Sequence, residues 1–267
     1  MDLKMPFRDF GDELPGISVL VPTYGRTHQL AELVYSYSIQ RYQGKSELII
    51  LNDRHDQNII YNEDPTVKII NVKERYETMG HKRNSLVELA QYPLVTSWDD
   101  DDIFLLERLN RGVKLMRKGY RASRENRSWI LKEHNALFYG IAGPPMLNMI
   151  LEKDLIKELG GFPLTQLNQD VGLSKKLQPF IHEESDTFLP PTTIYRHLRG
   201  DNKTYKRAAD YPIQVGYDHE DAKKFIEKSV DENIKKGIEP IGDIIIEPKW
   251  DRDWILFAKT MWSELKK

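Results

Sequence analysis

The sequence predicts an α/β fold with an open, mostly parallel central sheet that carries helices on both faces. Dense apolar runs such as Ile17–Val21 are typical of strands buried on both faces. These runs alternate with segments whose apolar residues recur at helical spacing, and this alternation indicates a parallel sheet. Polar clusters follow three of the predicted strands, at the end where such sheets bind ligands. The clusters are Pro22-Thr23-Tyr24, Asn52-Asp53 and Asp99 to Asp102.

The first predicted unit is a strand, a helix and a second strand. The first strand covers Ile17–Val21 and is closed by Pro22. The helix covers Thr27–Gln40, and Thr27 is its expected N-cap. The second strand covers Glu47–Leu51, so the three elements form a βαβ unit of about 35 residues.

The same alternation continues to residue 118. A short strand is predicted over Val67–Val72 and a buried strand over Pro93–Trp98, which ends at the aspartates. Helices are predicted over Lys82–Gln91 and Ile103–Lys118, because each segment places its apolar residues on one side.

The second half of the chain is less regular. Strands at a mixed edge of the sheet are predicted between Ser128 and Ile141, and a late strand over Thr192–His197. Three helices are predicted, the first of them ended by Gly160-Gly161: Glu152–Leu159, Val171–Leu177 and Asp218–Lys236. A domain boundary is predicted near residue 200. Beyond it, Trp250, Trp254 and Phe257 share one face of a C-terminal helix that we expect to dock on the main domain. An interfacial membrane helix or a partner surface is the alternative for this helix.

Composition narrows the classes of function. The chain has 267 residues, a net charge of −2 and no cysteine. Disulfides, zinc thiolate sites and a cysteine nucleophile are therefore excluded. No run approaches the roughly 20 apolar residues of a membrane span. We expect a cytoplasmic protein, whose membrane contact would be peripheral, at the inner membrane surface.

Four adjacent aspartates, Asp99 to Asp102, follow Trp98. Adjacent carboxylates repel one another, and a solvated acidic turn is the simplest interpretation of such a run. Its position at the end of a buried strand favours a binding role. In an extended segment Asp99 and Asp101 would converge, as would Asp100 and Asp102. Oxygen ligands suit Mn²⁺ or Mg²⁺, which would relieve the repulsion and clamp a diphosphate.

Other polar residues have both a structural and a functional interpretation. Asp53, at a strand tip, either caps a turn or accepts a hydrogen bond from a base or ribose. Lys82 and Arg83 lie where a helix opens, which is either a solvated basic turn or a site for pyrophosphate. Asp170 is either a helix cap or a general base that deprotonates an acceptor hydroxyl. His197 is either structural or a metal ligand.

The order and spacing of these motifs resemble the family 2 glycosyltransferases, which have the GT-A fold. The resemblance covers roughly residues 15 to 200 and rests on these segments: Val19–Arg26, Leu48–Asp53, Lys82-Arg83-Asn84, Trp98–Ile103, Gly160–Pro163 and Gln169-Asp170. It implies an enzyme that transfers a sugar from a nucleotide-diphosphate donor, a UDP-sugar, with the help of Mn²⁺ or Mg²⁺. Residues 1–200 would form the GT-A nucleotide-sugar-binding and catalytic domain, and residues 201–267 a helical extension packed on it.

The resemblance also implies a role for each matching residue. The donor would be bound by side chains around the nucleotide, its base and its diphosphate: Pro22, Thr23, Tyr24, Arg26, Asp53, Lys82, Arg83, Asp99 and Asp100. The metal ligands would be Asp101, Asp102 and His197. Asp99 and Asp101 match the family's Asp-x-Asp motif, and the neighbouring acids leave its register open by one residue. Asp170 matches the general base of the inverting members, which act by a single displacement.

Two positions depart from the family pattern. The family usually carries an acid where this chain has Asn52, and again where it has Gln169. Activity is still expected, because Asp170 is retained.

Two rival functions are weighed against the transferase. A sugar-nucleotide nucleotidylyltransferase would normally carry a glycine-rich loop after the first strand, whereas this chain reads Pro-Thr-Tyr-Gly-Arg from Pro22 to Arg26. A catalytically weak nucleotide-sugar-binding or structural module is favoured only by Gln169.

The acceptor stays open between a polysaccharide, a lipid-linked sugar, a protein and a hydroxylated DNA base. Two basic stretches, Arg117–Arg127 and Lys203–Arg207, would suit a phosphate-rich acceptor. Solvated helix faces and loops are the simpler interpretation of both stretches.

Overall fold

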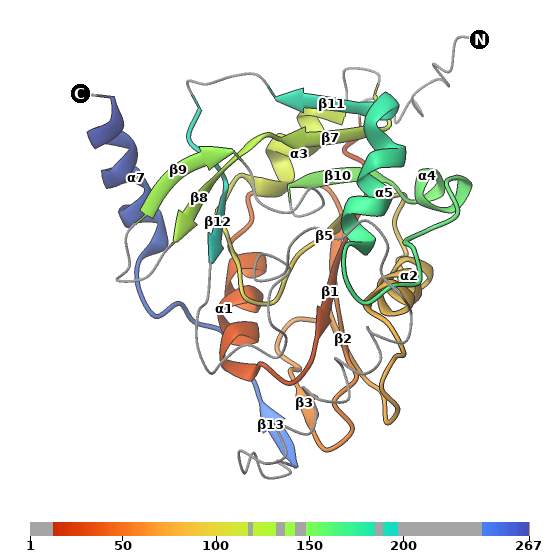
Figure 1. Cartoon of the computed structure of the whole chain (residues 1–267). Coiled ribbons are helices and arrows are strands. Elements are labelled where there is room, and N and C mark those ends of the chain that lie inside the picture. The colour runs from red at the N-terminus through yellow and green to blue at the C-terminus, as the bar shows by residue number, and fades with distance from the viewer. Residues whose placement is uncertain are drawn as a thin grey trace.

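The computed structural model describes residues 13–116, 120–131, 148–184, 189–196 and 242–266, together with the backbone of residues 137–141. Its central sheet has seven strands: β1 (Ile17–Thr23), β2 (Ser46–Asn52), β4 (Val67–Asn71), β5 (Leu94–Ser97), β7 (Ala122–Glu125), β10 (Met149–Glu152) and β11 (Ile181–Glu184). Their order in space is β11-β7-β10-β5-β1-β2-β4 (Figure 1). Only β10 runs antiparallel to its neighbours, so the predicted mostly parallel α/β sheet is confirmed.

Helices cover both faces of this sheet because successive side chains of a strand point to opposite sides. Ile17, Val19 and Val21 of β1 pack with α1 (Thr27–Ser38) and α3 (Arg108–Met116). Leu20 lies in the other apolar cluster, together with residues of three helices: α2 (Met79–Leu89), α4 (Lys153–Glu158) and α5 (Gln169–Leu177). Figure 1 shows these three helices gathered on one side of the sheet.

A second sheet of four strands lies beside the first. Its strands are β6 (Ile103–Phe104), β8 (Arg127–Leu131), β9 (Leu137–Ile141) and β12 (Thr193–Arg196), in the order β6-β12-β8-β9. The C-terminal helix α7 (Trp254–Leu265) packs on this sheet through Trp254 and Ala258, next to Trp129 (Figure 1). A short pair, β3 (Asn58–Ile60) with β13 (Asp243–Ile245), joins the chain's last part to its first, and a 3₁₀ turn covers Gln178–Phe180.

Several predicted elements need correction. The helix expected from Ile103 begins only at Arg108, because Ile103 and Phe104 pair with β12 and Phe104 stacks on Trp98. Thr27 does not cap α1: Arg26 occupies the N-cap position and makes no side-chain capping bond. The strands predicted between Ser128 and Ile141 belong to the second sheet, and β7, β10 and β11 of the first sheet were not predicted.

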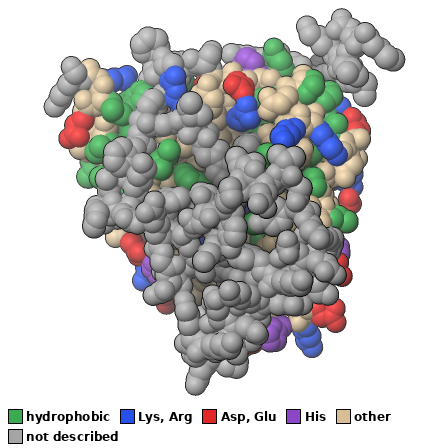
Figure 2. Space-filling model, viewed as in Figure 1, with side chains coloured by type: hydrophobic (Ala, Val, Ile, Leu, Met, Phe, Trp, Pro, Cys, Tyr) green, Lys and Arg blue, Asp and Glu red, His purple; other side chains and the backbone are tan. Residues whose placement is uncertain are grey.

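The basic stretch Arg117–Arg127 is not a solvated face where the structure describes it. Arg121 is buried and pairs with Glu152 at 2.6 Å and with Glu158 at 2.7 Å. Arg124 pairs with Glu183 of the neighbouring strand. Figure 2 shows charged side chains of both signs, interspersed with apolar ones, over the described part of the face in view. The described arginines are thus used within the fold and lend no support to a phosphate-rich acceptor.

The division at residue 200 stays a prediction. The predicted helix Asp218–Lys236 and the stretch Lys203–Arg207 lie outside the described residues. None of the described helices is long and apolar enough to cross a membrane.

The segment 160–166 is fastened to the first turn and a half of α2. Asn84 forms two hydrogen bonds with the backbone of Phe162, at 2.8 and 2.9 Å. The backbone N–H of Gly80 donates to the carbonyl oxygen of Thr165 at 3.1 Å. A Cβ on Gly80 would lie 1.8 Å from the carbonyl oxygen of Pro163, so only glycine permits this close approach. The segment leads directly into α5, which begins at Gln169.

We expect Gly80→Ala to destabilise the protein by about 1–3 kcal/mol, the usual cost of overpacking. At an exposed position inside a helix, the same Gly→Ala change would instead stabilise the protein by about 1 kcal/mol. Gly242→Ala is the control, because a Cβ there would meet no atom within 4 Å and the loss should be much smaller. Urea unfolding measures both, and a gain in stability for Gly80→Ala would contradict the packing described.

Candidate active site

The three polar clusters predicted after strand ends meet at one edge of the central sheet. β1 lies between β2 and β5 and runs parallel to both. Thr23, the last residue of β1, is in register with Asn52, the last residue of β2, and Asp53 follows immediately. The four aspartates follow β5 in the same way. The clusters therefore share the carboxyl edge of the sheet, where α/β folds bind ligands.

The aspartates form a turn rather than the extended segment that the sequence suggested. The backbone N–H of Asp102 donates to the carbonyl oxygen of Asp99 at 3.3 Å. The turn brings carboxylate oxygens of Asp99, Asp101 and Asp102 within 4.8 Å of one another. Asp100 points elsewhere and accepts a hydrogen bond from the Thr23 hydroxyl at 2.6 Å. The predicted convergence of Asp100 with Asp102 is therefore wrong.

Arginines neutralise part of this charge. Arg26 lies 2.7 Å from an Asp100 oxygen and 2.9 Å from an Asp101 oxygen, while Arg83 lies 2.7 Å from Asp99. Burial raises the pKa of Asp100 and the charge of Asp101 adds to this effect, whereas Arg26 and the Thr23 hydroxyl lower it. The repulsion that a metal was expected to relieve is thus already reduced by two side chains of the protein.

Asp53 and Lys82 form a buried ion pair at the tip of β2. The Lys82 ammonium lies 2.5 Å from Asp53, and both side chains are at most 5% exposed. The second carboxylate oxygen of Asp53 accepts from the backbone N–H of Tyr76 at 3.1 Å. Burial lowers the pKa of Lys82, and Asp53 opposes that shift. Lys82 therefore orients Asp53 and does not present its charge at the start of the helix.

Tyr24 borders the same edge. The guanidinium of Arg75 lies over the Tyr24 ring, 4.3 Å from its centroid, and both side chains are partly exposed. Pro22 is buried within β1. Sequence reasoning missed Arg75, since an isolated arginine between a strand and a helix belongs to no motif.

The start of α2 is not an open anion site. The backbone N–H of Met79 donates to the Gln166 side chain at 3.1 Å, and that of Gly80 to Thr165. The N–H of His81 donates to the hydroxyl of Thr78, which caps the helix. Of the groups considered for a pyrophosphate at this helix start, the backbone amides already have partners, so only side chains could serve.

Asp170 lies in the first turn of α5 and is partly buried. Burial raises its pKa, the positive charge of Arg83 lowers it, and the charge of Asp99 raises it. Arg83 is paired with Asp99 of the acid turn (Asp99–Asp102), and its charge also acts on Asp170. Asp170 is not the helix cap: Asn168 occupies that position, with a left-handed φ of 58°.

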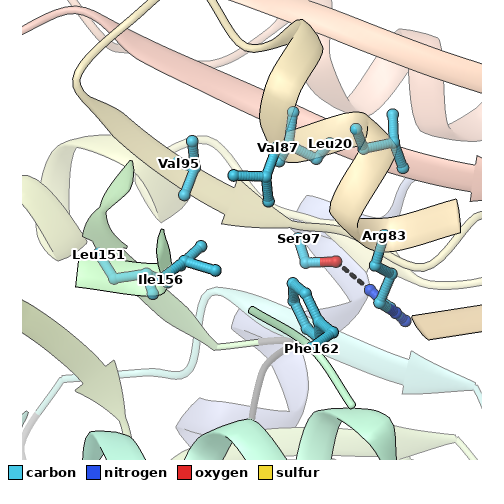
Figure 3. A pocket seen from close by; sticks show the side chains of 9 residues that line it. Leu20, Arg83, Val87, Val95, Ser97, Leu151, Ile156 and Phe162 are labelled. Carbon is cyan, nitrogen blue, oxygen red and sulfur yellow. Dashed lines mark hydrogen bonds between the residues drawn. The ribbon is translucent and has the colours of Figure 1, made fainter. Parts of the chain in front are cut away.

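Arg83 lies at the edge of a small, largely apolar cavity (Figure 3). Its guanidinium donates to the Ser97 hydroxyl and lies 5.9 Å from the centroid of the Phe162 ring. The rest of the lining is aliphatic: Leu20, Leu86, Val87, Val95, Leu151 and Ile156. A lining of this kind would not hold a charged diphosphate, so the cavity is not itself the donor site. Ser97 and Phe162, which border it, hold the Arg83 guanidinium in place.

The cluster of Asp99, Asp101 and Asp102 fits a hard divalent cation. It offers only carboxylate oxygens, the ligand type that Mg²⁺ and Mn²⁺ prefer. His197, the third predicted ligand, lies outside the described residues. The structure adds Asp99, which was predicted to bind the donor, to the predicted pair Asp101 and Asp102.

Comparison with known proteins agrees with this fold. Residues 18–133 match the family model described as glycosyl transferase family 2. No curated protein matches the chain. The structure of S. aureus TarS 1-349 with UDP is similar, with a TM-score of 0.54 and 16% identity over 68% of this chain and 60% of that one. The complex of TarS 1-349 with UDP-GlcNAc gives a TM-score of 0.56 and 14% identity over 82% and 73%.

These comparisons confirm the predicted resemblance for residues 18–133, which hold every quoted segment except Gly160–Pro163 and Gln169-Asp170. At such low identity the TarS structures establish the fold, and the predicted GT-A fold is confirmed. The chain spans about 60% of the length of the first of them.

The Lys82–Asp53 pair gives a direct test of this geometry. Lys82→Met should destabilise the protein by about 3–5 kcal/mol, because it leaves Asp53 buried without a counter-charge. Adding Asp53→Asn should recover much of that loss. Lys157→Met is the control: Lys157 lies 2.7 Å from Glu88, and the two side chains are 44% and 66% exposed, so its loss should cost less than about 1 kcal/mol. Chemical denaturation measures all three, and equal losses for the two lysines would refute the assignment.

Proposed function

We propose that this chain, whose residues 18–133 match glycosyl transferase family 2, transfers a sugar from a UDP-sugar to an acceptor hydroxyl. The observation that carries the proposal is the convergence of the acid turn, Asp53 and Arg83 at the carboxyl edge of β5, β1 and β2. Asp170, in the first turn of α5, lies within the influence of the charges of Arg83 and Asp99. Support for the donor class comes from the TarS structures of the same fold, which hold UDP and UDP-GlcNAc.

The donor would lie across the ends of β2, β1 and β5. Asp53 has its two oxygens oriented by Lys82 and by the Tyr76 amide, so it is set to accept a hydrogen bond from the base. Tyr24 offers an aromatic surface beside it, and Arg83 would face the diphosphate. These residues bind and orient the nucleotide without forming a covalent bond to it.

Asp99, Asp101 and Asp102 would hold Mn²⁺ or Mg²⁺. When bound, such an ion offsets the negative charge of a leaving diphosphate. Arg83 contacts Asp99 and Arg26 contacts Asp101, so two of the three ligand carboxylates are already held in place by arginine side chains.

Asp170 would act as the general base. Its carboxylate takes the proton of the acceptor hydroxyl as that oxygen bonds to the anomeric carbon, and the bond from that carbon to the diphosphate oxygen breaks. Attack from the face opposite the leaving group inverts the anomeric carbon. The raised pKa of Asp170 suits this role, since a base works best when its pKa lies closer to the pH of the reaction.

Donor hydrolysis tests the proposal. Purified protein with Mn²⁺ and a panel of nucleotide sugars should release UDP from one UDP-sugar. Asp101→Ala should lower this release by at least about 100-fold, as should a chelator, because both remove stabilisation of the leaving group. Asp64→Ala, in the turn before β4 where Asp64 bonds Thr66, is the control and should keep full activity.

If no donor is hydrolysed and calorimetry detects no binding of any nucleotide sugar, the transferase proposal is wrong. The chain would then be a structural module of the same fold.

The pH dependence of the rate tests the role of Asp170. Because only the carboxylate accepts a proton, activity should be lost as the pH falls through the pKa of Asp170. That pKa is raised, so the loss should centre above the ordinary aspartate value of 3.8. Arg83→Gln should move it to still higher pH, since Arg83 favours the carboxylate.

Asp170→Asn should remove this acid limb and lower kcat by about 10²–10⁴ while UDP still binds. A shift to lower pH in Arg83→Gln, or an unchanged rate in Asp170→Asn, would exclude Asp170 as the base.

A further inference from the structure

We propose that Glu32 and Arg196 are positioning residues for the metal site, and that they couple this site to the docking of the C-terminal segment 250–254. Neither residue is assigned a role by the sequence motifs. The inference rests on the proposed function, because it concerns how the acid turn binds its metal.

Arg196 holds two successive residues of the acid turn. It is the last residue of β12, and its backbone N–H donates to the Asp102 carboxylate at 2.8 Å. Its side-chain Nε donates to the carbonyl oxygen of Asp101. One residue thus fixes both a ligand carboxylate and the backbone of the neighbouring ligand, so a shift of Arg196 would move the oxygens that meet at the metal site.

Glu32 in turn holds Arg196. The Nη1 of Arg196 donates to a Glu32 carboxylate oxygen, and the two residues are only 1% and 7% exposed. A buried carboxylate is tolerated when it is paired and hydrogen-bonded, and losing its charge leaves the buried guanidinium without its counter-ion. The position of Arg196 therefore depends on an ion pair with α1, which is 164 residues away in the sequence.

The C-terminal segment closes over the same glutamate. The indole N–H of Trp254 donates to the Glu32 carboxylate at 3.3 Å, and the backbone N–H of Asp251 donates to the same oxygen at 3.4 Å. The indole N–H of Trp250 lies 3.2 Å from the carbonyl oxygen of Glu32 and 3.0 Å from the hydroxyl of Ser36. Docking of this segment supplies hydrogen bonds to the carboxylate that anchors Arg196.

His28, Glu32 and Asp251 also lie close enough together to suggest a second cation site. Glu32 is committed to Arg196 and Trp254, and His28 contacts Asp251 directly at 3.2 Å. These contacts explain why the three side chains lie together at the edge of the docked segment 250–254, and no second cation site is needed to explain it.

Residues outside the ligand set commonly control metal affinity. Partners that orient the ligands typically change that affinity by about 10- to 100-fold when they are removed. The path from Trp254 through Glu32 and Arg196 to Asp101 and Asp102 is such a set, and it is made of hydrogen bonds between buried groups. The docked segment therefore raises the affinity of the acid turn for a divalent cation.

Mn²⁺ binding, measured by calorimetry on the full chain with saturating UDP, tests this path. Glu32→Gln keeps the side-chain shape but removes the charge that pairs with Arg196, and it should weaken Mn²⁺ binding about 10-fold. Trp254→Phe keeps the ring but removes one N–H donor to Glu32, and it should weaken binding by about 3-fold.

Glu47→Gln is the matched control. Glu47 is a buried carboxylate on β2 that bonds Ser18 and Lys68, so its replacement should cost stability but leave Mn²⁺ affinity unchanged. Thermal unfolding of each metal-free variant shows whether it is folded.

Unchanged Mn²⁺ affinity in folded Glu32→Gln overturns the inference while leaving the proposed function intact. If Glu32→Gln does not fold, Trp254→Phe decides in the same way. An equal loss in Glu47→Gln also overturns it, because the effect would then be one of general stability. A wild-type chain that binds no Mn²⁺ with UDP overturns the proposed metal site and this inference together.

Discussion

The constraint on which the site depends is the placement of four consecutive carboxylates at the end of a buried strand. Asp100, Asp101 and Asp102 are at most 8% exposed, so water alone cannot offset their mutual repulsion. Arginines from three different parts of the fold supply compensating positive charge. Arg26 follows β1, Arg83 lies on α2, and Arg196 ends β12. The relative positions of these elements are therefore tied to the electrostatics of one turn.

This arrangement explains why the helices and the second sheet matter for chemistry. Arg83 can face Asp99 only because Phe162 and Ser97 hold its guanidinium, and Phe162 is held in turn by Asn84. The segment that carries Phe162 continues into α5 and so sets the position of Asp170. The acid turn and the proposed base are thus connected through α2, which is a physical reason for Lys82-Arg83-Asn84 to be one motif.

The sequence predicted what depends on local pattern and missed what depends on distant pairing. The dense runs of β1, β2 and β5 and the acids that follow them were visible, because burial on both faces demands an unbroken apolar run. The acids were predicted as extended, yet they turn, since Ile103 must reverse to pair with Ile194 of β12. No local sequence pattern near Glu32 predicts its pairing with Arg196, because this ion pair forms only once α1 and β12 are folded together.

Gln169, where the family usually carries an acid, bears on whether the chain has lost activity. Its side chain is 6% exposed, and its Oε1 accepts from the backbone N–H of Asp170 at 2.9 Å. A glutamate could make the same bond but would add a negative charge beside Asp170 and raise its pKa further. Burial already raises that pKa while Arg83 limits the shift. Glutamine therefore retains the local geometry, and the departure from the family pattern is no argument for an inactive module.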